Sequence, residues 1–168
     1  LQRFRCFNGP FHLGGKGLLG RLVSAVSKPL DYLEWIDGAG LDTRARVLDV
    51  GCGKGFLLYD FTTVVPGIEV TGLDVSEYAV ENAKEEVKDR LQVGHAKTLP
   101  FEDSSFDLVV SINTLHNLYN MELDSALREI ERVGKKNKYI CVESYRNEEE
   151  KVNLLYWQVT CEAFCTPE

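Results

Sequence analysis

The sequence predicts a doubly wound α/β fold, in which a mostly parallel sheet has helices on both faces. Short β-branched runs alternate along the chain with apolar residues at helical spacing, which is typical of this class. One such run, Arg46–Val50, leads into a loop with glycine at every second position. The 168 residues, of which 44% are hydrophobic, suffice for one domain with a single core.

Residues 1–40 are predicted to form an N-terminal arm with cap helices, ahead of the main region 41–168 of the same domain. The beginning of the arm has no clear period. Apolar residues then recur at helical spacing from Leu18 to Ile36, and Pro29 is expected to divide this stretch into two short helices.

Strands and helices alternate in the main region. The predicted strands are Arg46–Val50, Ile68–Asp74, Leu91–Val93, Phe106–Ile112 and Tyr139–Ser144. The predicted helices lie near Phe56–Thr63, Glu77–Lys88, Leu123–Val133 and from Glu148 to about Phe164, with Ser76 as N-cap of the second. Right-handed crossovers would place the loops after the first, second and fourth strands along one edge, where a ligand is expected.

The glycine loop has the character of a nucleotide-like cofactor site. Glycine lacks a Cβ, so the loop can turn sharply, and the positive end of the following helix faces the ligand. A dinucleotide would need glycine at the sixth position of the loop, where this chain has Phe56. Asp49, two residues before Gly51, would repel a pyrophosphate but attract an ammonium and a sulfonium. Both residues therefore favour S-adenosylmethionine over NAD.

A second acid ends the next predicted strand. Asp74 follows the glycine loop by about 20 residues, where a carboxylate accepts hydrogen bonds from ribose hydroxyls. Because both cofactors contain adenosine, Asp74 supports nucleoside binding without choosing between them.

Four segments resemble those of class I S-adenosylmethionine-dependent methyltransferases, of the broad small-domain group. They are VLDVGCGKG, VTGLDVSEYAVENAK, VGHAKTLPFEDSSFDLVVSINTLHNL and EIERVGKKNKYICVES. The resemblance implies a Rossmann-like fold, a methyltransferase domain over residues 41–168 that binds S-adenosyl-L-methionine, and S-adenosylhomocysteine as product. The family usually has two further, antiparallel strands. No convincing pair follows Ser144, so these strands are expected to be missing.

The resemblance also implies a set of cofactor-binding residues. They are Asp49, Gly51, Cys52, Gly53, Asp74, Val75, His95, Ala96 and Asn113. Asp49 would lie near the methionine ammonium, and Val75 would pack on the adenine face. The family often has an acid at the position of His95, which accepts a hydrogen bond from the adenine amino group. Neutral imidazole can accept through one nitrogen, whereas protonated imidazole cannot.

The catalytic group is less clearly marked, because methyl transfer from a sulfonium depends mainly on alignment. His116, after the fourth predicted strand, is the best candidate for a general base. Asn113 is followed by Thr114 and Leu115, unlike the Asn-Pro-Pro-Tyr signature of amide and adenine N-methyltransferases. The candidates to line or close the substrate side are Phe11, His12, Tyr32, Tyr119 and Tyr145.

Composition excludes several other classes. The formal net charge is −7 and the basic residues are scattered, so nucleic acid is disfavoured and a small-molecule acceptor is expected. No apolar run is long enough to span a membrane, and the first residues lack the pattern of a secretory signal. Five widely spaced cysteines and three histidines show no zinc spacing, so we expect no metal and reduced thiols in a cytoplasmic protein.

Two alternative functions stay open, as does the oligomeric state. A non-catalytic domain that binds S-adenosylmethionine or a partner would fit the missing strands and the missing adenine-side acid. An NAD(P)-dependent reductase is less favoured because of Phe56 and Asp49. The chain begins with leucine instead of methionine, so it is expected to be a fragment. The pattern does not indicate the methyl acceptor or the atom methylated.

Overall fold

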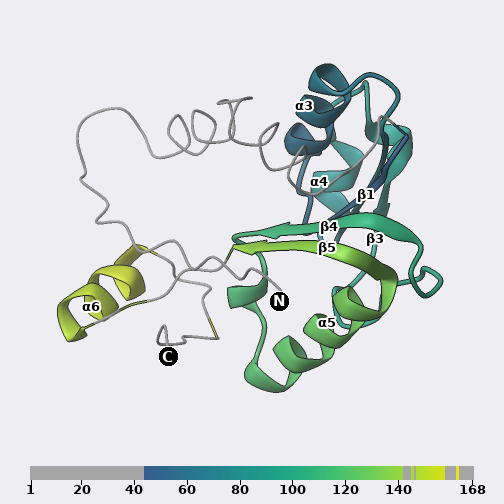
Figure 1. Cartoon of the computed structure of the whole chain (residues 1–168). Helices are drawn as coiled ribbons and strands as arrows, with labels where there is room; N and C mark the ends of the chain where they lie inside the picture. The colour runs from purple at the N-terminus through teal and green to yellow at the C-terminus, as the bar shows by residue number, and fades with distance from the viewer. Residues whose placement is uncertain (1–43, 142–144, 146, 158–161, 163–168) are drawn as a thin grey trace.

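The computed structural model describes residues 44–141, 145, 147–157 and 162 of the chain (Figure 1). The expected arm and cap helices of residues 1–40 lie outside these described residues, and so do Phe11, His12 and Tyr32.

A five-stranded sheet with the order β3-β2-β1-β4-β5 forms the centre of the fold. The strands are β1 (Arg46–Val50), β2 (Glu69–Asp74), β3 (Leu91–Val93), β4 (Phe106–Ile112) and β5 (Gly134–Cys141). All the pairings between them are parallel, so their carboxyl ends meet at one edge. The predicted doubly wound fold is confirmed, and the described residues contain no antiparallel strands.

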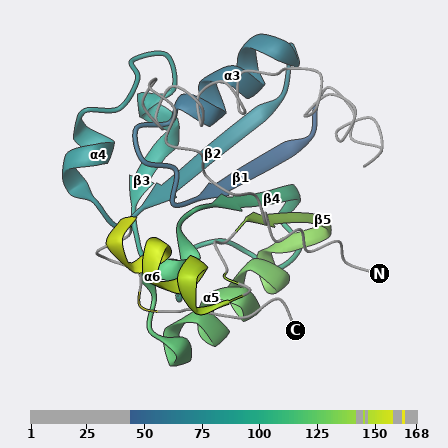
Figure 2. The ribbon, with the colours of Figure 1, turned by 90° about the vertical axis from the view of Figure 1, so that its left-hand side faces the viewer.

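Helices cover both faces of the sheet (Figure 2). α3 (Phe56–Val64) and α4 (Glu77–Glu81) lie on one face, and α5 (Asn120–Val133) lies on the other. The remaining described elements are the 3-10 helices η1 (Lys88–Arg90) and η2 (Leu115–Asn117) and the helix α6 (Glu148–Trp157), which lies beyond the carboxyl ends of β4 and β5 in Figure 1. No helix in the described part of the chain combines the length and the apolar character that a membrane crossing needs.

Two apolar clusters join the sheet to these helices. In the first, Leu58 and Phe61 of α3 pack against strand residues that include Val47. In the second, Ile130 of α5 packs against strand residues that include Leu48. Val47 and Leu48 are neighbours in β1, and successive side chains of a strand point to opposite faces. The apolar run of β1 therefore forms part of both clusters, as a central parallel strand should.

The helix predicted over Glu77–Lys88 is wrong in its second half, because α4 ends at Glu81. The N–H of Lys84 donates to the carbonyl of Lys54 in the glycine loop at 2.9 Å. Val87 is fully buried, and its Cγ2 lies 2.9 Å from where a Cβ on Gly55 would be. These contacts with the glycine loop override the local helical pattern.

The last predicted strand is misplaced at its beginning. β5 starts at Gly134 instead of Tyr139, and it pairs with β4 through contacts such as Leu108 with Asn137. The first half of β5 is rich in lysine and has no apolar strand pattern, so its extended conformation depends on pairing with β4. Of the predicted end of this strand, residues 142–144 lie outside the described residues. The helix predicted to reach Phe164 is described as α6 up to Trp157.

Candidate functional site

The candidate site lies at the carboxyl edge of the sheet, where the loops after β1, β2 and β4 meet. The N–H of Gly51 donates to the carbonyl of Leu73 at 2.7 Å, which holds the glycine loop against the end of β2. Thr114 from the loop after β4 packs against the same glycine. A Cβ built on Gly51 would lie 2.1 Å from Thr114 Oγ1. Only glycine fits between these two loops.

The glycine loop has a left-handed backbone at each of its three glycines. Their φ values are +84° at Gly51, +53° at Gly53 and +76° at Gly55. A Cβ on Gly51 or Gly55 would meet other side chains, whereas a Cβ on Gly53 would meet no atom of the described residues within 4 Å. Gly53 therefore presents bare backbone to open space, as a loop that a ligand approaches closely should.

Asp74 connects the end of β2 to the loops on either side of it. Its Oδ2 accepts a hydrogen bond from the N–H of Gly53 at 2.7 Å, and its Oδ1 accepts one from the N–H of Ser76 at 2.9 Å. Ser76 accepts from the N–H of Ala79 at 3.1 Å, which confirms it as the N-cap of α4. Val75 lies between these two residues and is 69% exposed, so its side chain is available to a ligand.

The Asp49 carboxylate is buried at the end of β1. It is 3% exposed, and no described residue donates a hydrogen bond to it or forms an ion pair with it. Burial, and then repulsion from Asp74, raise the pKa of Asp49 to about 7. A buried carboxylate without a partner costs free energy, so a cation placed beside it would be strongly favoured.

Cys52 lies in the same loop but is not a reactive group. The residue is 8% exposed, and its Sγ packs 2.7 Å from where a Cβ on Gly72 would be. Burial, together with the negative charges of Asp49 and Asp74, raises the pKa of the Cys52 thiol. The thiol stays protonated and is therefore a poor nucleophile.

His95 and Ala96 follow β3 beside Asp74. The N–H of Gly94 donates to the carbonyl of Asp74 at 2.9 Å, and Ala96 is 8% exposed. His95 Nδ1 accepts a hydrogen bond from the N–H of Lys97 at 3.3 Å, which in neutral imidazole assigns the proton to Nε2. The free nitrogen is then a donor, so His95 does not reproduce the acceptor that the resemblance implies at this position.

Asn113 is held in an unusual conformation directly after β4. Its φ is +52°, a left-handed value that asparagine tolerates better than most residues. The N–H of Asn113 donates to the carbonyl of Cys141 at 2.9 Å, and its Oδ1 lies 3.7 Å from Cys141 Sγ. The turn at the end of β4 is therefore fixed by the end of β5.

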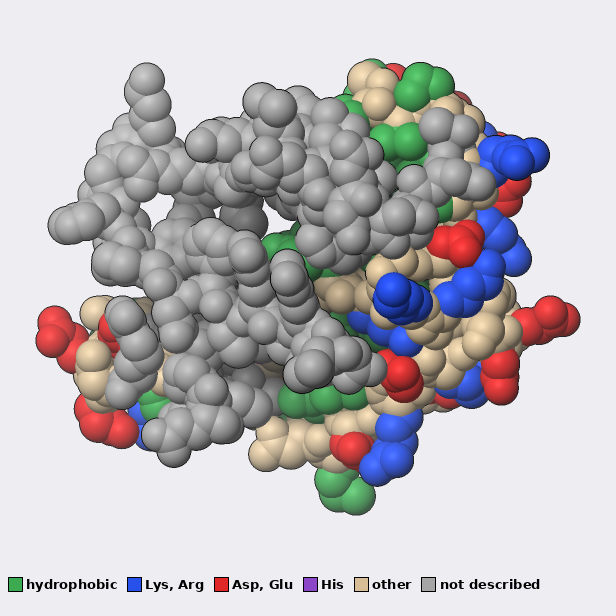
Figure 3. Space-filling model, viewed as in Figure 1, with side chains coloured by type: hydrophobic (Ala, Val, Ile, Leu, Met, Phe, Trp, Pro, Cys, Tyr) green, Lys and Arg blue, Asp and Glu red, His purple; other side chains and the backbone are tan. Residues whose placement is uncertain are grey.

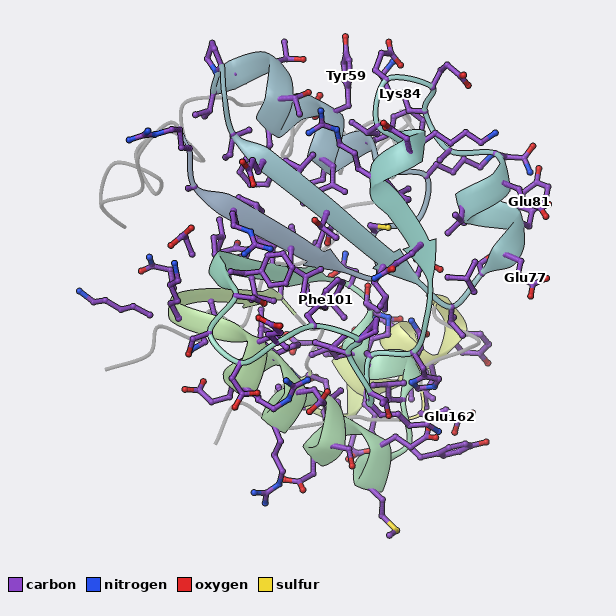
Figure 4. All side chains as sticks on the ribbon, turned by 90° about the vertical axis from the view of Figure 1, so that its right-hand side faces the viewer. Tyr59, Glu77, Glu81, Lys84, Phe101 and Glu162 are labelled. Carbon is purple, nitrogen blue, oxygen red and sulfur yellow. The ribbon has the colours of Figure 1, made fainter. Side chains whose placement is uncertain are left out.

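His116 is buried within η2. It is 3% exposed, and its Nδ1 has no hydrogen-bond partner among the described residues. Burial lowers the pKa of His116, so the ring is neutral and has an acceptor nitrogen to offer. The carbonyl of His116 accepts from the N–H of Glu162 at 2.8 Å, which brings this C-terminal residue, labelled in Figure 4, to the same edge.

The tyrosines expected on the substrate side differ in exposure. Tyr119, just before α5, is 61% exposed. Tyr145 is half-buried, and Lys151 Nζ lies 5.4 Å from the centre of its ring. Two further residues that hold the loops of the site in place carry no clear signal in the sequence. Thr114 is marked only by its place beside Asn113, and Arg132, which contacts the loop after β3, only by its i,i+3 spacing from an acid.

These residues fit the charges of S-adenosylmethionine. Asp49 is a buried acid with no cation beside it among the described residues, Gly53 borders space that those residues leave open, and Asp74 presents carboxylate oxygens beside that glycine. Within the described ranges, no group of three or more His, Cys, Asp or Glu side chains is arranged to hold a metal. On the face drawn in Figure 3, the coloured acidic and basic side chains are interspersed, and no broad basic patch gathers there.

Comparisons with known proteins place this chain in a family. A family described as "Methyltransferase domain" matches residues 41–165. The chain is 32% identical over 131 residues to demethylmenaquinone methyltransferase of Thermotoga maritima, a match that covers 69% of this chain and 56% of that protein. It is 29% identical over 136 residues to sterol 4-C-methyltransferase strm-1 of Caenorhabditis elegans, over 77% of this chain and 39% of that protein.

Structural similarity agrees with these matches. The fold superposes on the crystal structure of the YcgJ protein of Bacillus subtilis with a TM-score of 0.64 and 28% identity, over 83% of this chain and 62% of that one. The matched regions cover only 39% and 56% of the two curated relatives named above. With 125 of its residues inside the family match, 41–165, the chain belongs to the methyltransferase domain family of class I S-adenosylmethionine-dependent methyltransferases.

Proposed function

We propose that this chain binds S-adenosyl-L-methionine and transfers its methyl group to a small-molecule acceptor. The observation that carries the proposal is the Asp49 carboxylate, which is buried with no partner among the described residues and precedes the open glycine Gly53 in the same loop region. The cationic methionine end of the cofactor is the complement of that charge. A dinucleotide phosphate is not.

Bound S-adenosylmethionine would supply a methyl group that is attached to a positively charged sulfur. When the methyl group is transferred, that sulfur becomes a neutral thioether. The ionised Asp49 pairs with the ammonium of the methionine part. Asp74 accepts from the ribose hydroxyls, because each of its two oxygens accepts one hydrogen bond from the described residues and a carboxylate has about four acceptor sites. Val75 packs on the adenine, and the loop of His95 and Ala96 borders it.

His116 is proposed as the general base when the acceptor must lose a proton. Its lowered pKa keeps the imidazole neutral, and its Nδ1 has no described partner to compete for an incoming proton. Alignment supplies the larger part of the rate, and the base contributes about 10²–10⁴-fold where it is needed.

The acceptor is proposed to be apolar. Two relatives are named for methylating demethylmenaquinone and a sterol, which are both apolar small molecules. The ring of Tyr119, a candidate for the substrate side that is 61% exposed, agrees with such an acceptor. The net charge of −7 disfavours a nucleic-acid acceptor.

Two measurements test this function. In calorimetric titration, S-adenosylhomocysteine should bind one per chain and NADH should not bind. With cofactor labelled in its methyl group, radioactivity should appear in an organic extract when a quinone, a sterol or a phenol is offered. His116→Asn should keep the affinity for S-adenosylhomocysteine and slow the transfer to a phenol by about 10²–10⁴-fold. Binding of NADH alone would indicate a reductase, and binding of S-adenosylhomocysteine without transfer to any acceptor would indicate a non-catalytic domain. Either result would overturn the proposal.

A further inference from the structure

The loop between β3 and β4 has no regular structure of its own, although it carries the proposed adenine contacts. It runs over residues 94–105 without helix or strand and begins at the Gly94 N–H, which donates to Asp74. A loop of this length keeps one conformation only if other elements hold it. The contacts that hold it come from one face of α5.

Arg132 of α5 binds the backbone of this loop at several points. Its Nη2 donates to the carbonyl of Leu99 at 3.0 Å, and its Nη1 donates to the carbonyl of Phe101 at 2.8 Å. The same Nη1 donates to Asp103 Oδ1 at 2.8 Å, and the main-chain carbonyl of Arg132 accepts from the N–H of Ser104 at 2.8 Å. A single residue thus fixes the second half of the loop.

Glu129, one turn earlier on α5, completes the arrangement. Its Oε1 accepts from Arg132 Nε at 2.7 Å, and its Oε2 accepts from Arg132 Nη2 at 2.8 Å, a two-point pair that fixes the guanidinium plane. Glu129 Oε2 also accepts from the N–H of Leu99 at 2.7 Å. Both backbone groups of Leu99 are therefore bound by the Glu129–Arg132 pair.

Apolar contacts and a second ion pair hold the rest of the loop to α5. Ala96 and Leu99 are 8% and 3% exposed and pack in the cluster that contains Ile130. Lys97, the residue whose N–H binds His95, pairs with Glu122 of α5 at 2.6 Å between Nζ and Oε1. Phe101, labelled in Figure 4, anchors the loop against the strands, its ring packing edge-on against a β4 phenylalanine at 5.0 Å.

We propose that Glu129 and Arg132 are positioning residues that set the affinity for the nucleoside half of the cofactor, by fixing the backbone that carries His95 and Ala96. This inference rests on the proposed function. The side-chain contacts of both residues are with the loop at residues 99–103 and with each other. Glu129 and Arg132 act through Leu99, which lies three residues after Ala96, and through the turn that joins Ala96 to Leu99.

The test compares Arg132→Lys and Glu129→Gln with the matched control Arg128→Lys. Lysine keeps the positive charge at residue 132 but cannot make the two-point pair and the two carbonyl contacts together. Arg128 forms an ion pair with Asp124 on the same helix, but the two side chains are 78% and 64% exposed and bind no loop. Each variant is first checked for native circular dichroism, and Glu129→Gln serves if Arg132→Lys does not fold.

We expect both test variants to bind S-adenosylhomocysteine about tenfold more weakly, while Arg128→Lys binds as the parent does. The KM for S-adenosylmethionine should rise and kcat at saturating cofactor should hold. Amide hydrogen exchange should rise over residues 95–104 and stay unchanged in β1. Unchanged affinity despite faster exchange would make the pair merely structural, and a fall in kcat at constant KM would also overturn the inference. If the parent chain binds no S-adenosylhomocysteine, the proposed function itself fails, a result distinct from equal binding by parent and variants.

Discussion

At the scale of single residues, the cofactor contact proposed for Asp49 comes at a cost in folding stability. Its pKa is raised from 3.8 to about 7 in the folded chain, so the folded state holds this proton more tightly than the unfolded state does. The stability that comes with the bound proton is present at low pH and is lost as pH rises from 3.8 through about 7. Asparagine resembles the neutral acid at every pH. We expect Asp49→Asn to gain about 2–3 kcal/mol on the parent, without ligand, between pH 5 and pH 8.

Urea unfolding at the two pH values measures this difference. Asp89→Asn, at an exposed acid of η1, should show no such gain and serves as the control. In calorimetry at pH 8, Asp49→Asn should bind S-adenosylhomocysteine at least tenfold more weakly than the parent, because the ammonium loses its partner. A stability difference that does not change with pH would show that Asp49 has the same pKa in the folded and the unfolded chain, which would contradict the raised pKa.

His95 makes a second prediction for a single side chain. Since its Nδ1 accepts from the N–H of Lys97, its free nitrogen is a donor and would leave the amino group of an adenine bound there without an acceptor. His95→Asp would restore an acceptor. We expect it to tighten S-adenosylhomocysteine several-fold and to weaken the inosine analogue, whose 6-oxo group meets a carboxylate. Calorimetry with both ligands gives the ratio, and His95→Asn, which offers both a donor and an acceptor, should fall between the two. An unchanged ratio in His95→Asp would mean that this side chain does not face the purine.

At the scale of elements, two glycines of the same loop are expected to differ in their roles: Gly51 matters for folding stability, and Gly53 matters for the proposed ligand binding. A Cβ on Gly51 would lie 2.1 Å from Thr114 Oγ1 at a φ of +84°, so Gly51→Ala should destabilise by about 3 kcal/mol through steric clash and backbone strain. Gly53 has open space around it and a φ of +53°, so Gly53→Ala should cost only about 1–2 kcal/mol while its methyl group obstructs the ligand. Urea unfolding and titration with S-adenosylhomocysteine measure the two effects. Equal stability losses at both positions would contradict the assignment of Gly53 to the ligand side.

The same elements show what sequence patterns can and cannot predict. β1 and β4 are buried on both faces, so their apolar runs gave the strands directly. β5 begins among lysines, and its extension there depends on pairing with β4. The second half of the predicted Glu77–Lys88 helix is absent because Val87 is buried against the glycine loop instead. Contacts distant in sequence decided both cases, and a local pattern does not contain them.

For the molecule as a whole, the parallel sheet and the edge that carries the site were predictable, whereas many of the contacts that support the site were not. Alternating strand and helix patterns imply a parallel sheet, which brings Asp49, Asp74 and Asn113 to one edge whatever the details of the loops. The tautomer of His95 and the two-point pair of Glu129 with Arg132 depend on loop geometry. Such hydrogen bonds leave no periodic signal.

A ligand held by loops from four strands should stabilise the whole described sheet, not one part of it. A ligand that binds only the folded state adds about 2.7 kcal/mol at a concentration of 100 Kd. For a chain of 168 residues, this corresponds to a rise in Tm of about 5–11 °C. We expect S-adenosylhomocysteine to produce such a rise in scanning calorimetry at pH 8, and NADH at equal concentration to produce none.

The rise in Tm should shrink at pH 5, because Asp49 must then lose a proton before it can pair with the ammonium. Asp49→Asn should show a small rise that hardly changes between the two pH values. A rise in the parent that is as large at pH 5 as at pH 8 would contradict the role given to this carboxylate, even if the cofactor binds.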